Sequence, residues 1–320
     1  MLGKIKQTVY RCLGIEQTRY LNFLYRYDMK NYLHYSCMSE ENREAMATEI
    51  RILSHTIEKA MSLPDCRLGF GKAKITRLIE LCEAYGSKAE IKDPQALKLA
   101  NSVIHEYLKF NTRNGYEITF LPEKYMRNST EDDIASGVMY VQAKDKTDFE
   151  TIAKSRHSVR YYSDREIDIN DIRRAVEIAQ TAPSACNRQS VHVYACVDKD
   201  KIGQIMEMHG GVRGFGTPGV IFAIAGNLNL YQGEYERNTV FVDGGIFVMN
   251  MLYALEAVGM VSCPIIWGSE PTNDDKLIDI LGISRSHKVV SLIMAGYPVQ
   301  PEYRVAVSAK RELHDILHVV

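Results

Sequence analysis

The chain has 320 residues, of which 46% are hydrophobic and 25% charged, and its formal net charge is −1. This composition is typical of a globular protein with a substantial core. A net charge near zero gives no general attraction to nucleic acid or to an anionic membrane, so we expect neither partner, and any anion site has to be local.

The cysteines and the apolar segments indicate the compartment. Seven cysteines are scattered along the chain without a CxxC or Cys/His zinc spacing, which predicts reduced thiols and no metal site. The N-terminus has no long apolar region, and no later run reaches membrane-spanning length. We therefore expect a cytoplasmic protein without an integral membrane segment.

The first half, residues 1–150, is predicted to be a mostly helical extension that ends in a polar linker. Apolar residues recur at three- and four-residue spacing within 43–63, 74–87 and 93–110, which predicts three amphipathic helices. Asp93 and Pro94 suit the N-cap and the first position of the third helix. Residues 111–150 are the predicted linker, with a short strand at 116–121. The tyrosine-rich segment 19–35 is expected to pack on the second half, with a glycan or a membrane surface as alternatives.

The second half, residues 151–320, has α/β texture. Helices are predicted at 168–182, 239–259 and 273–282. Two β-rich runs at 190–198 and 218–226 are separated by a further helix, and a last strand is predicted at 288–298. The segment 239–259 is apolar on nearly every face. We therefore expect that helix to be buried in a core or in a subunit interface.

A cationic cluster opens the second half. Arg156, His157 and Arg160 surround Ser158 in the stretch SRHSVRYYS. Guanidinium groups bind phosphate bidentately, and a fixed positive charge can neutralise an electron-rich ring. Taken alone, the same cluster also fits a solvated face or structural salt bridges.

A polar loop follows the first predicted helix of this half. In APSACNRQS, Ser184, Asn187 and Gln189 offer donors and acceptors between a helix and a strand. Such groups orient a planar heterocycle or a sugar chain rather than transfer protons. Alone, this stretch also fits an ordinary polar turn.

Two further stretches complete the candidate site. The apolar loop Pro264–Gly268 has backbone amides that can face a ligand ring, although such a loop also fits a core segment. Lys310 and Arg311 form a second cationic pair for a phosphate, or simple surface charge.

The order and spacing of these motifs resemble the FMN-dependent nitroreductase family. The Arg-[Arg/His]-Ser-x-[Arg/Lys] motif is matched at 156–160, and the Pro-Ser-x-x-Asn-x-Gln motif begins at Pro183. The apolar helix and the end of the last strand also fit the family, at Asp243, Gly244, Gly245 and Gly259 and at Gly296, Tyr297 and Pro298. The resemblance covers about residues 151–320. The first half resembles an N-terminal region of some relatives encoded among polysaccharide-biosynthesis proteins.

The resemblance implies an α+β fold, in which a central antiparallel-rich sheet is flanked by helices and a long buried helix forms a dimer contact. It implies a homodimer with FMN sites at the subunit interface and NADH or NADPH as electron donor. The expected reaction passes electrons through the flavin N5 to a small organic acceptor, nitroaromatic or quinone-like. No side chain is nominated as catalytic, because the flavin carries the chemistry.

The resemblance also implies a role for each motif. Arg156, with Arg311 and Lys310, would hold the FMN phosphate, and His157 and Ser158 would contact phosphate or ribityl oxygens. Arg160 would lie near the N1/O2 edge of the ring. Pro183, Ser184, Asn187 and Gln189 would come from the partner subunit. The loop residues along the flavin ring would be Pro264, Ile265, Ile266 and Gly268.

Other functions remain open from the sequence. Within the same fold, the chain fits a flavin-dependent dehydrogenase or an enzyme that consumes reduced flavin. It also fits a flavin-free interaction protein with a degenerate nitroreductase domain. No GxGxxG follows a strand, which argues against a separate dinucleotide-binding domain.

Overall fold

A computed structural model of the protein describes residues 15–39, 42, 44–61, 66–91, 93–126, 136–138, 149–268, 270–300, 305 and 313–320. In the N-terminal half the elements are α2 (Ile15–Tyr35), α3 (Ala45–Met61), α4 (Lys72–Gly86), α5 (Pro94–Arg113) and the 3-10 helix η1 (Glu123–Tyr125).

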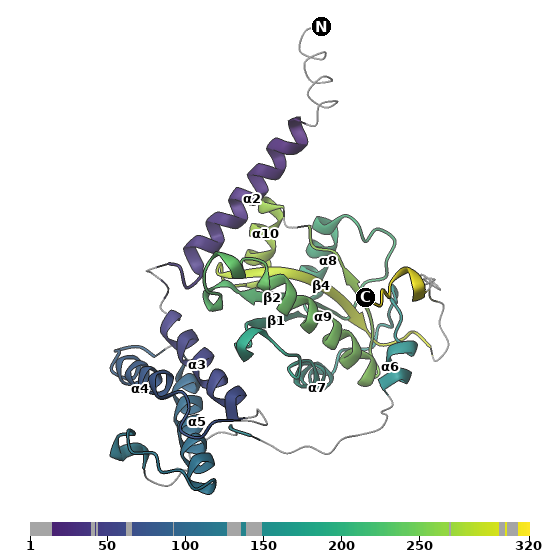
Figure 1. Ribbon diagram of the computed structural model, residues 1–320. Helices are drawn as coiled ribbons and strands as arrows, with labels where there is room; N and C mark the ends of the chain where they lie inside the picture. The colour runs from purple at the N-terminus through teal and green to yellow at the C-terminus, as the bar shows by residue number, and fades with distance from the viewer. Residues whose placement is uncertain are drawn as a thin grey trace.

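The helices α3, α4 and α5 enclose a core of their own (Figure 1). Its fully buried side chains include Ile50, Leu78 and Val103, one from each helix. The start of α5 follows the predicted capping, because the Asp93 side chain accepts a hydrogen bond from Ala96 N and Pro94 occupies the first turn. The three predicted amphipathic helices are therefore confirmed.

The strand expected at 116–121 is wrong. This stretch is irregular, and Ile118, Leu121 and Tyr125 are buried in the helical core. Alternating apolar residues suit a strand only where a neighbouring strand offers backbone partners. Here the apolar side chains pack on helices instead, so the beginning of the predicted linker is part of the helical core.

The C-terminal half is an antiparallel sheet with helices on both sides. Its helical elements are α6 (Phe149–Ser155), α7 (Ile169–Ala179), η2 (Ala185–Asn187), α8 (Lys199–His209), η3 (Leu228–Leu230), η4 (Glu234–Glu236), α9 (Thr239–Ala257), α10 (Pro271–Leu281) and η5 (Leu313–Asp315). The strands are β1 (Val191–Cys196), β2 (Val220–Asn227), β3 (Val261–Ile265) and β4 (His287–Gly296), in the order β1-β2-β4-β3. All pairings are antiparallel, which confirms the α+β fold.

The central strand β2 shows why helices cover both faces. Successive side chains of a strand point to opposite faces. Ile221 and Ala223 accordingly join the cluster with α8 and α10, whereas Phe222 and Ile224 join the cluster with α7 and α9. Figure 1 shows these two helix pairs on opposite sides of the sheet.

Helix α9 is buried on one side only. Met251 and Leu255 pack on the sheet, whereas Phe241, Val242 and Ile246 expose between 41% and 58% of their surface. Contrary to the expectation from the sequence, the span Glu234–Ala257 is long and apolar enough to cross a membrane by length and composition. The same composition follows from a helix that packs one face on a core and leaves a second apolar face for another contact.

The C-terminal end of α2 packs on the second half, as expected for the tyrosine-rich segment. Tyr32 shares a cluster with Leu228, Tyr231 and Val240. Farther along α2, Asp28 forms an ion pair of 3.0 Å with the largely buried Lys288 of β4.

Candidate functional site

Arg156 follows α6 and lies beside the beginning of β3. Ser158 forms a parallel bridge with Ser262, and Val159 N donates a hydrogen bond of 2.9 Å to Ser262 O. The Arg156 Nε and Nη1 atoms are buried and have no hydrogen-bond partner. Two buried guanidinium nitrogens without partners are costly, so this position is suited to an anion that would accept from both of them.

The other residues of the cationic cluster, His157 and Arg160, contact backbone oxygens of the same stretch of chain. His157 Nδ1 lies 2.6 Å from Ser155 O. The exposed Arg160 donates to Ser158 O over 3.1 Å, and its guanidinium lies 5.6 Å from the centre of the Phe215 ring. Burial raises the pKa of the Cys263 thiol on β3 despite the two nearby arginines, so that cysteine is a neutral neighbour of the cluster.

The loop 183–190 has an unusual backbone. Cys186, Asn187 and Gln189 all have positive φ angles, of 50°, 50° and 52°. Left-handed conformation costs a residue other than glycine about 1 kcal/mol, and such strain gathers at functional sites. Asn187 and Gln189 are exposed. The Ser184 hydroxyl oxygen accepts from Gln189 N over 2.9 Å, which fixes the turn.

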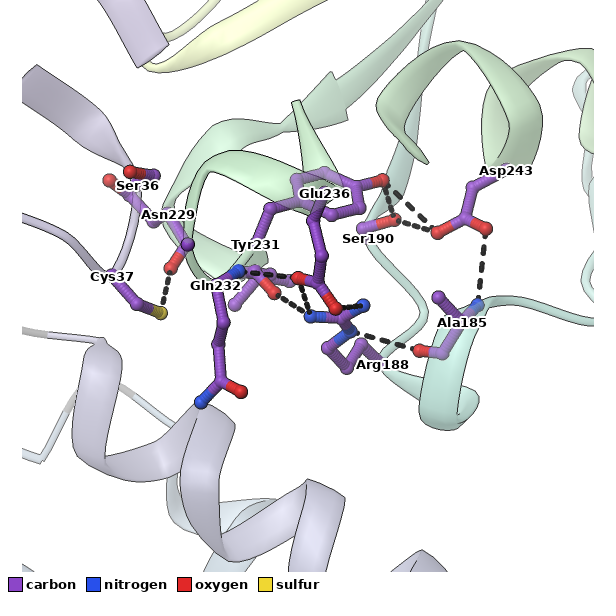
Figure 2. A network of polar contacts seen from close by, with 12 residues as sticks. Ser36, Cys37, Ala185, Arg188, Ser190, Asn229, Tyr231, Gln232, Glu236 and Asp243 are labelled. Atoms are coloured by element: carbon purple, nitrogen blue, oxygen red, sulfur yellow. Dashed lines mark hydrogen bonds and ion pairs between the residues drawn. The ribbon is translucent and has the colours of Figure 1, made fainter. Parts of the chain in front are cut away.

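Buried polar groups form hydrogen bonds with this loop (Figure 2). Arg188 donates to Ala185 O over 2.9 Å and to Glu236 over 2.7 and 3.0 Å. Burial would lower the pKa of Arg188, but hydrogen bonding to Glu236 outweighs it and the pKa is raised. Asp243, at the beginning of α9, accepts from Ala185 N over 3.1 Å and also from Ser190 and Tyr231.

The loop after β3 is held by the Trp267 indole and by His209, whose Nε2 lies 2.7 Å from Ile266 O. Trp267 Nε1 donates a 2.6 Å hydrogen bond to the buried Asp274 of α10, and Asp274 also pairs with Lys288 at 3.1 Å. Ile266 is 87% exposed. A cavity of about 330 Å³ adjoins this loop and is lined by His209, Ile266, Trp267, Gly268, Glu270 and Asn273.

The comparisons agree with the order of these motifs. Residues 153–209 match the model of the family described as "Nitroreductase family". The C-terminal half is similar to the nitroreductase family, and residues 151–320 are called the nitroreductase domain below. The resemblance stated for residues 151–320 is confirmed, and that of the N-terminal half stays a prediction.

Two curated relatives align with this nitroreductase domain. A protein of Archaeoglobus fulgidus named "Putative NADH dehydrogenase/NAD(P)H nitroreductase" is 29% identical over 147 residues, which are 45% of this chain and 82% of the relative. An "FMN reductase [NAD(P)H]" of Bacillus subtilis is 26% identical over 156 residues, which are 44% of this chain and 62% of the relative. A solved structure of a nitroreductase with bound FMN from Bacteroides fragilis is 18% identical, has a TM-score of 0.44 and covers 55% of this chain and 100% of its own.

Within one nitroreductase domain, the predicted site residues fall into two groups. Ala185 contacts Asp243 near the beginning of α9, whereas Phe149 of α6, just before the cationic cluster, packs its ring 4.9 Å from Tyr253 near the end of α9. With a rise of 1.5 Å per residue, the ten residues between Asp243 and Tyr253 span roughly 15 Å. The cationic cluster and the loop 183–190 therefore lie toward opposite ends of α9.

Two other predictions have a different outcome. The Ile265 side chain is buried in the core cluster beneath the sheet, so only its backbone is left for a ligand. Lys310 and Arg311 lie outside the described residues. Arg188 was not predicted from the sequence, because a charged residue in an exposed polar turn gives no sign of complete burial. Its position between Asn187 and Gln189 was the only signal in the sequence.

Proposed function

We propose that the nitroreductase domain binds FMN and passes electrons from NAD(P)H to a small organic acceptor. The observation that carries this proposal is the Arg156 side chain, with two buried nitrogens that have no partner at the first position of the family motif. The names of the two curated relatives, an NAD(P)H nitroreductase and an FMN reductase, support the same donor and cofactor.

The donor set fits a flavin mononucleotide in kind. Arg156 would hold the phosphate, together with Lys310 and Arg311, and His157 and Ser158 would contact phosphate or ribityl oxygens. Arg160 is exposed and would bring its positive charge to the electron-rich edge of the ring. When bound, FMN supplies the redox chemistry by taking a hydride from NAD(P)H and returning the electrons to the acceptor.

We further propose that two copies of the chain complete each site. Asn187 and Gln189 are exposed but belong to the opposite end of α9 from the cationic cluster. Exposed apolar side chains, Phe241, Val242 and Ile246, lie along the same helix. An antiparallel pairing of α9 with a second copy would cover this face and bring the loop 183–190 of one chain toward the cationic cluster of the other.

Absorption spectroscopy tests the proposal. We expect the purified protein, alone or after addition of FMN, to show a flavin spectrum that NADH or NADPH bleaches without oxygen, and a nitroaromatic or quinone to restore it. A flavin spectrum that neither nicotinamide bleaches would favour a flavin-dependent dehydrogenase or a consumer of reduced flavin. A folded protein that takes up no FMN would contradict the proposal and favour a flavin-free interaction protein.

A pair of variants connects the spectrum to Arg156. Arg156→Gln is expected to weaken FMN binding about tenfold or more, because it removes a charge-assisted phosphate contact. Arg174→Gln is the matched control, since Arg174 is 68% exposed and pairs with Glu177 on its own helix α7. Equal affinities for the two variants would exclude Arg156 from the phosphate site.

A further inference from the structure

Segment 227–237 connects β2 to α9. It is hydrogen-bonded to the N-terminal half. Tyr32 donates its hydroxyl to Gly233 O over 2.7 Å, and Cys37 N donates to Tyr231 O over 2.9 Å. The Asn42 amide donates to Asn229 O over 2.7 Å. Each contact joins residues that are between 187 and 201 positions apart in the chain.

Glu44, just before α3, adds two more contacts to the same segment. Its carboxylate accepts from the side-chain amides of Asn227 and Asn229, over 3.2 and 3.0 Å. A charged acceptor makes stronger hydrogen bonds than a neutral one. Residues 32–44 therefore fix the position of segment 227–237, which has no strand or long helix of its own.

Segment 227–237 in turn holds Arg188, whose side chain is completely buried. Leu230 O accepts from Arg188 Nη1 over 2.8 Å, and both terminal nitrogens bind Glu236. The Tyr231 ring lies 5.2 Å from the guanidinium carbon. In Figure 2, Glu236 and Tyr231 lie beside the Arg188 guanidinium.

On its other side Arg188 holds the loop 183–190. Its Nε donates to Ala185 O, while Asp243 accepts from Ala185 N and from Ser190. Helix α3 also lies beside η2 of this loop. Three left-handed residues in one short loop persist only when surrounding contacts fix the backbone.

We propose that residues 32–44 of the N-terminal half are a positioning element for the loop 183–190, that they act through segment 227–237, and that Arg188 is the positioning residue between the two. The N-terminal half thereby preorganises a loop that contacts the cofactor and raises the affinity for FMN. The last step rests on the proposed function, whereas the coupling between the two halves does not.

The test uses the full-length chain with and without FMN. Two variants, Tyr32→Phe and Glu44→Ala, remove hydrogen bonds between residues 32–44 and segment 227–237 without changing the loop itself. Each has a matched control: Tyr25→Phe changes a 70% exposed tyrosine on the same helix, and Glu49→Ala changes a glutamate of α3 that pairs with the exposed Arg77. Hydrogen exchange is followed at the amides of Ala185, Asn187, Arg188 and Gln189, all of which donate hydrogen bonds in the loop.

In the FMN-free protein, Glu44→Ala is expected to speed exchange at these amides about tenfold and Tyr32→Phe by about fivefold, with both controls unchanged. The dissociation constant for FMN should rise by similar factors. Tyr32→Phe removes one hydroxyl and keeps the packing, so it remains informative if Glu44→Ala does not fold.

Two results would overturn the proposal. Exchange in the loop 183–190 that stays at the rate of the controls would show that the N-terminal half does not fix the loop. Faster exchange with an unchanged FMN affinity would show that the hydrogen bonds from residues 32–44 do not contribute to FMN binding. Failure of the proposed function itself appears separately, as an unaltered chain that binds no FMN, and the exchange rates still decide the coupling in that case.

Discussion

Arg188 and Glu236 form an ion pair beside the loop 183–190, with side chains that are 0% and 29% exposed. A buried charge that loses its partner is strongly destabilising, at roughly 3–5 kcal/mol. Glu236→Gln keeps the shape but removes the charge, so we expect a loss of stability of about 3 kcal/mol in chemical unfolding. Glu234→Gln, an exposed residue of the same short helix η4, is the control. A Glu236→Gln variant as stable as that control would mean that solvent reaches Arg188 after all.

His287 gives the stability of the protein a pH dependence. Burial, followed by the neighbouring His192, lowers the pKa of His287 from 6.5 to about 4. The native imidazole therefore stays neutral where the unfolded one takes up a proton, and the free energy of unfolding falls as pH drops from 6.5 toward 4, by roughly 3 kcal/mol. His287→Gln should flatten this part of the profile, measured by denaturant titrations at several pH values. Parallel profiles for the two proteins would contradict it.

At the residue level, the site predicted from the sequence consists of neighbours in the chain, and it stays a prediction. Arg156, Ser158 and Arg160 lie within five positions, and so do the polar residues of the loop 183–190, so spacing alone was informative. The buried contacts of Arg188 reach Glu236, 48 residues away. Such contacts depend on how β2 and α9 pack, which no local pattern encodes.

Among the elements, β3, α10 and β4 meet at Asp274, which accepts from Trp267 and pairs with Lys288. Trp267 is the only tryptophan of the chain, so its fluorescence reports on the loop after β3 alone. Asp274→Asn removes the charge that holds Lys288, and we expect the loop to loosen and the emission to shift to the red.

The neighbouring residue supplies the control for this experiment. Asp275→Asn changes an exposed aspartate of the same helix that pairs with Arg285 on the surface, and it should leave the emission unchanged because surface ion pairs contribute little. A red shift of equal size in both variants would show that the helix α10 as a whole, rather than the Asp274 contact, holds the indole.

Elements were predictable to the extent that their signals are local. The beginning of α5 followed from Asp93 and Pro94, since a cap and a first-turn proline act within one turn. The strand at 116–121 was mispredicted, because strand formation needs a partner and Ile118 found a helical core instead. An antiparallel-rich sheet followed from the β-rich runs at 190–198, 218–226 and 288–298 together with the family resemblance. Strand β3 was not predicted, because its end at Pro264 and Ile265 was expected to belong to a loop.

For the whole molecule, a division into a helical half and a nitroreductase domain followed, as a prediction, from the change in residue pattern near position 150. The contacts between the halves did not. They use single polar groups such as Tyr32, Asn42 and Glu44, which look like ordinary surface residues in sequence. A simple deletion of the first half would therefore remove these contacts along with any role it has toward the acceptor, which makes point variants the sharper experiment.

The apolar face of α9 makes a prediction about assembly. If two copies pair through this face, Ile246→Asp, at a position 41% exposed, buries a charge in the contact and should convert a dimer into a monomer in sedimentation analysis. Because the cationic cluster and the loop 183–190 would then be separated, FMN affinity should fall at the same time, by about tenfold or more. Val197→Asp, on an exposed residue after β1, should change neither. A monomer that keeps full FMN affinity would show that each chain builds its site alone, and an unaltered protein that is monomeric at all concentrations would remove the need for a second copy.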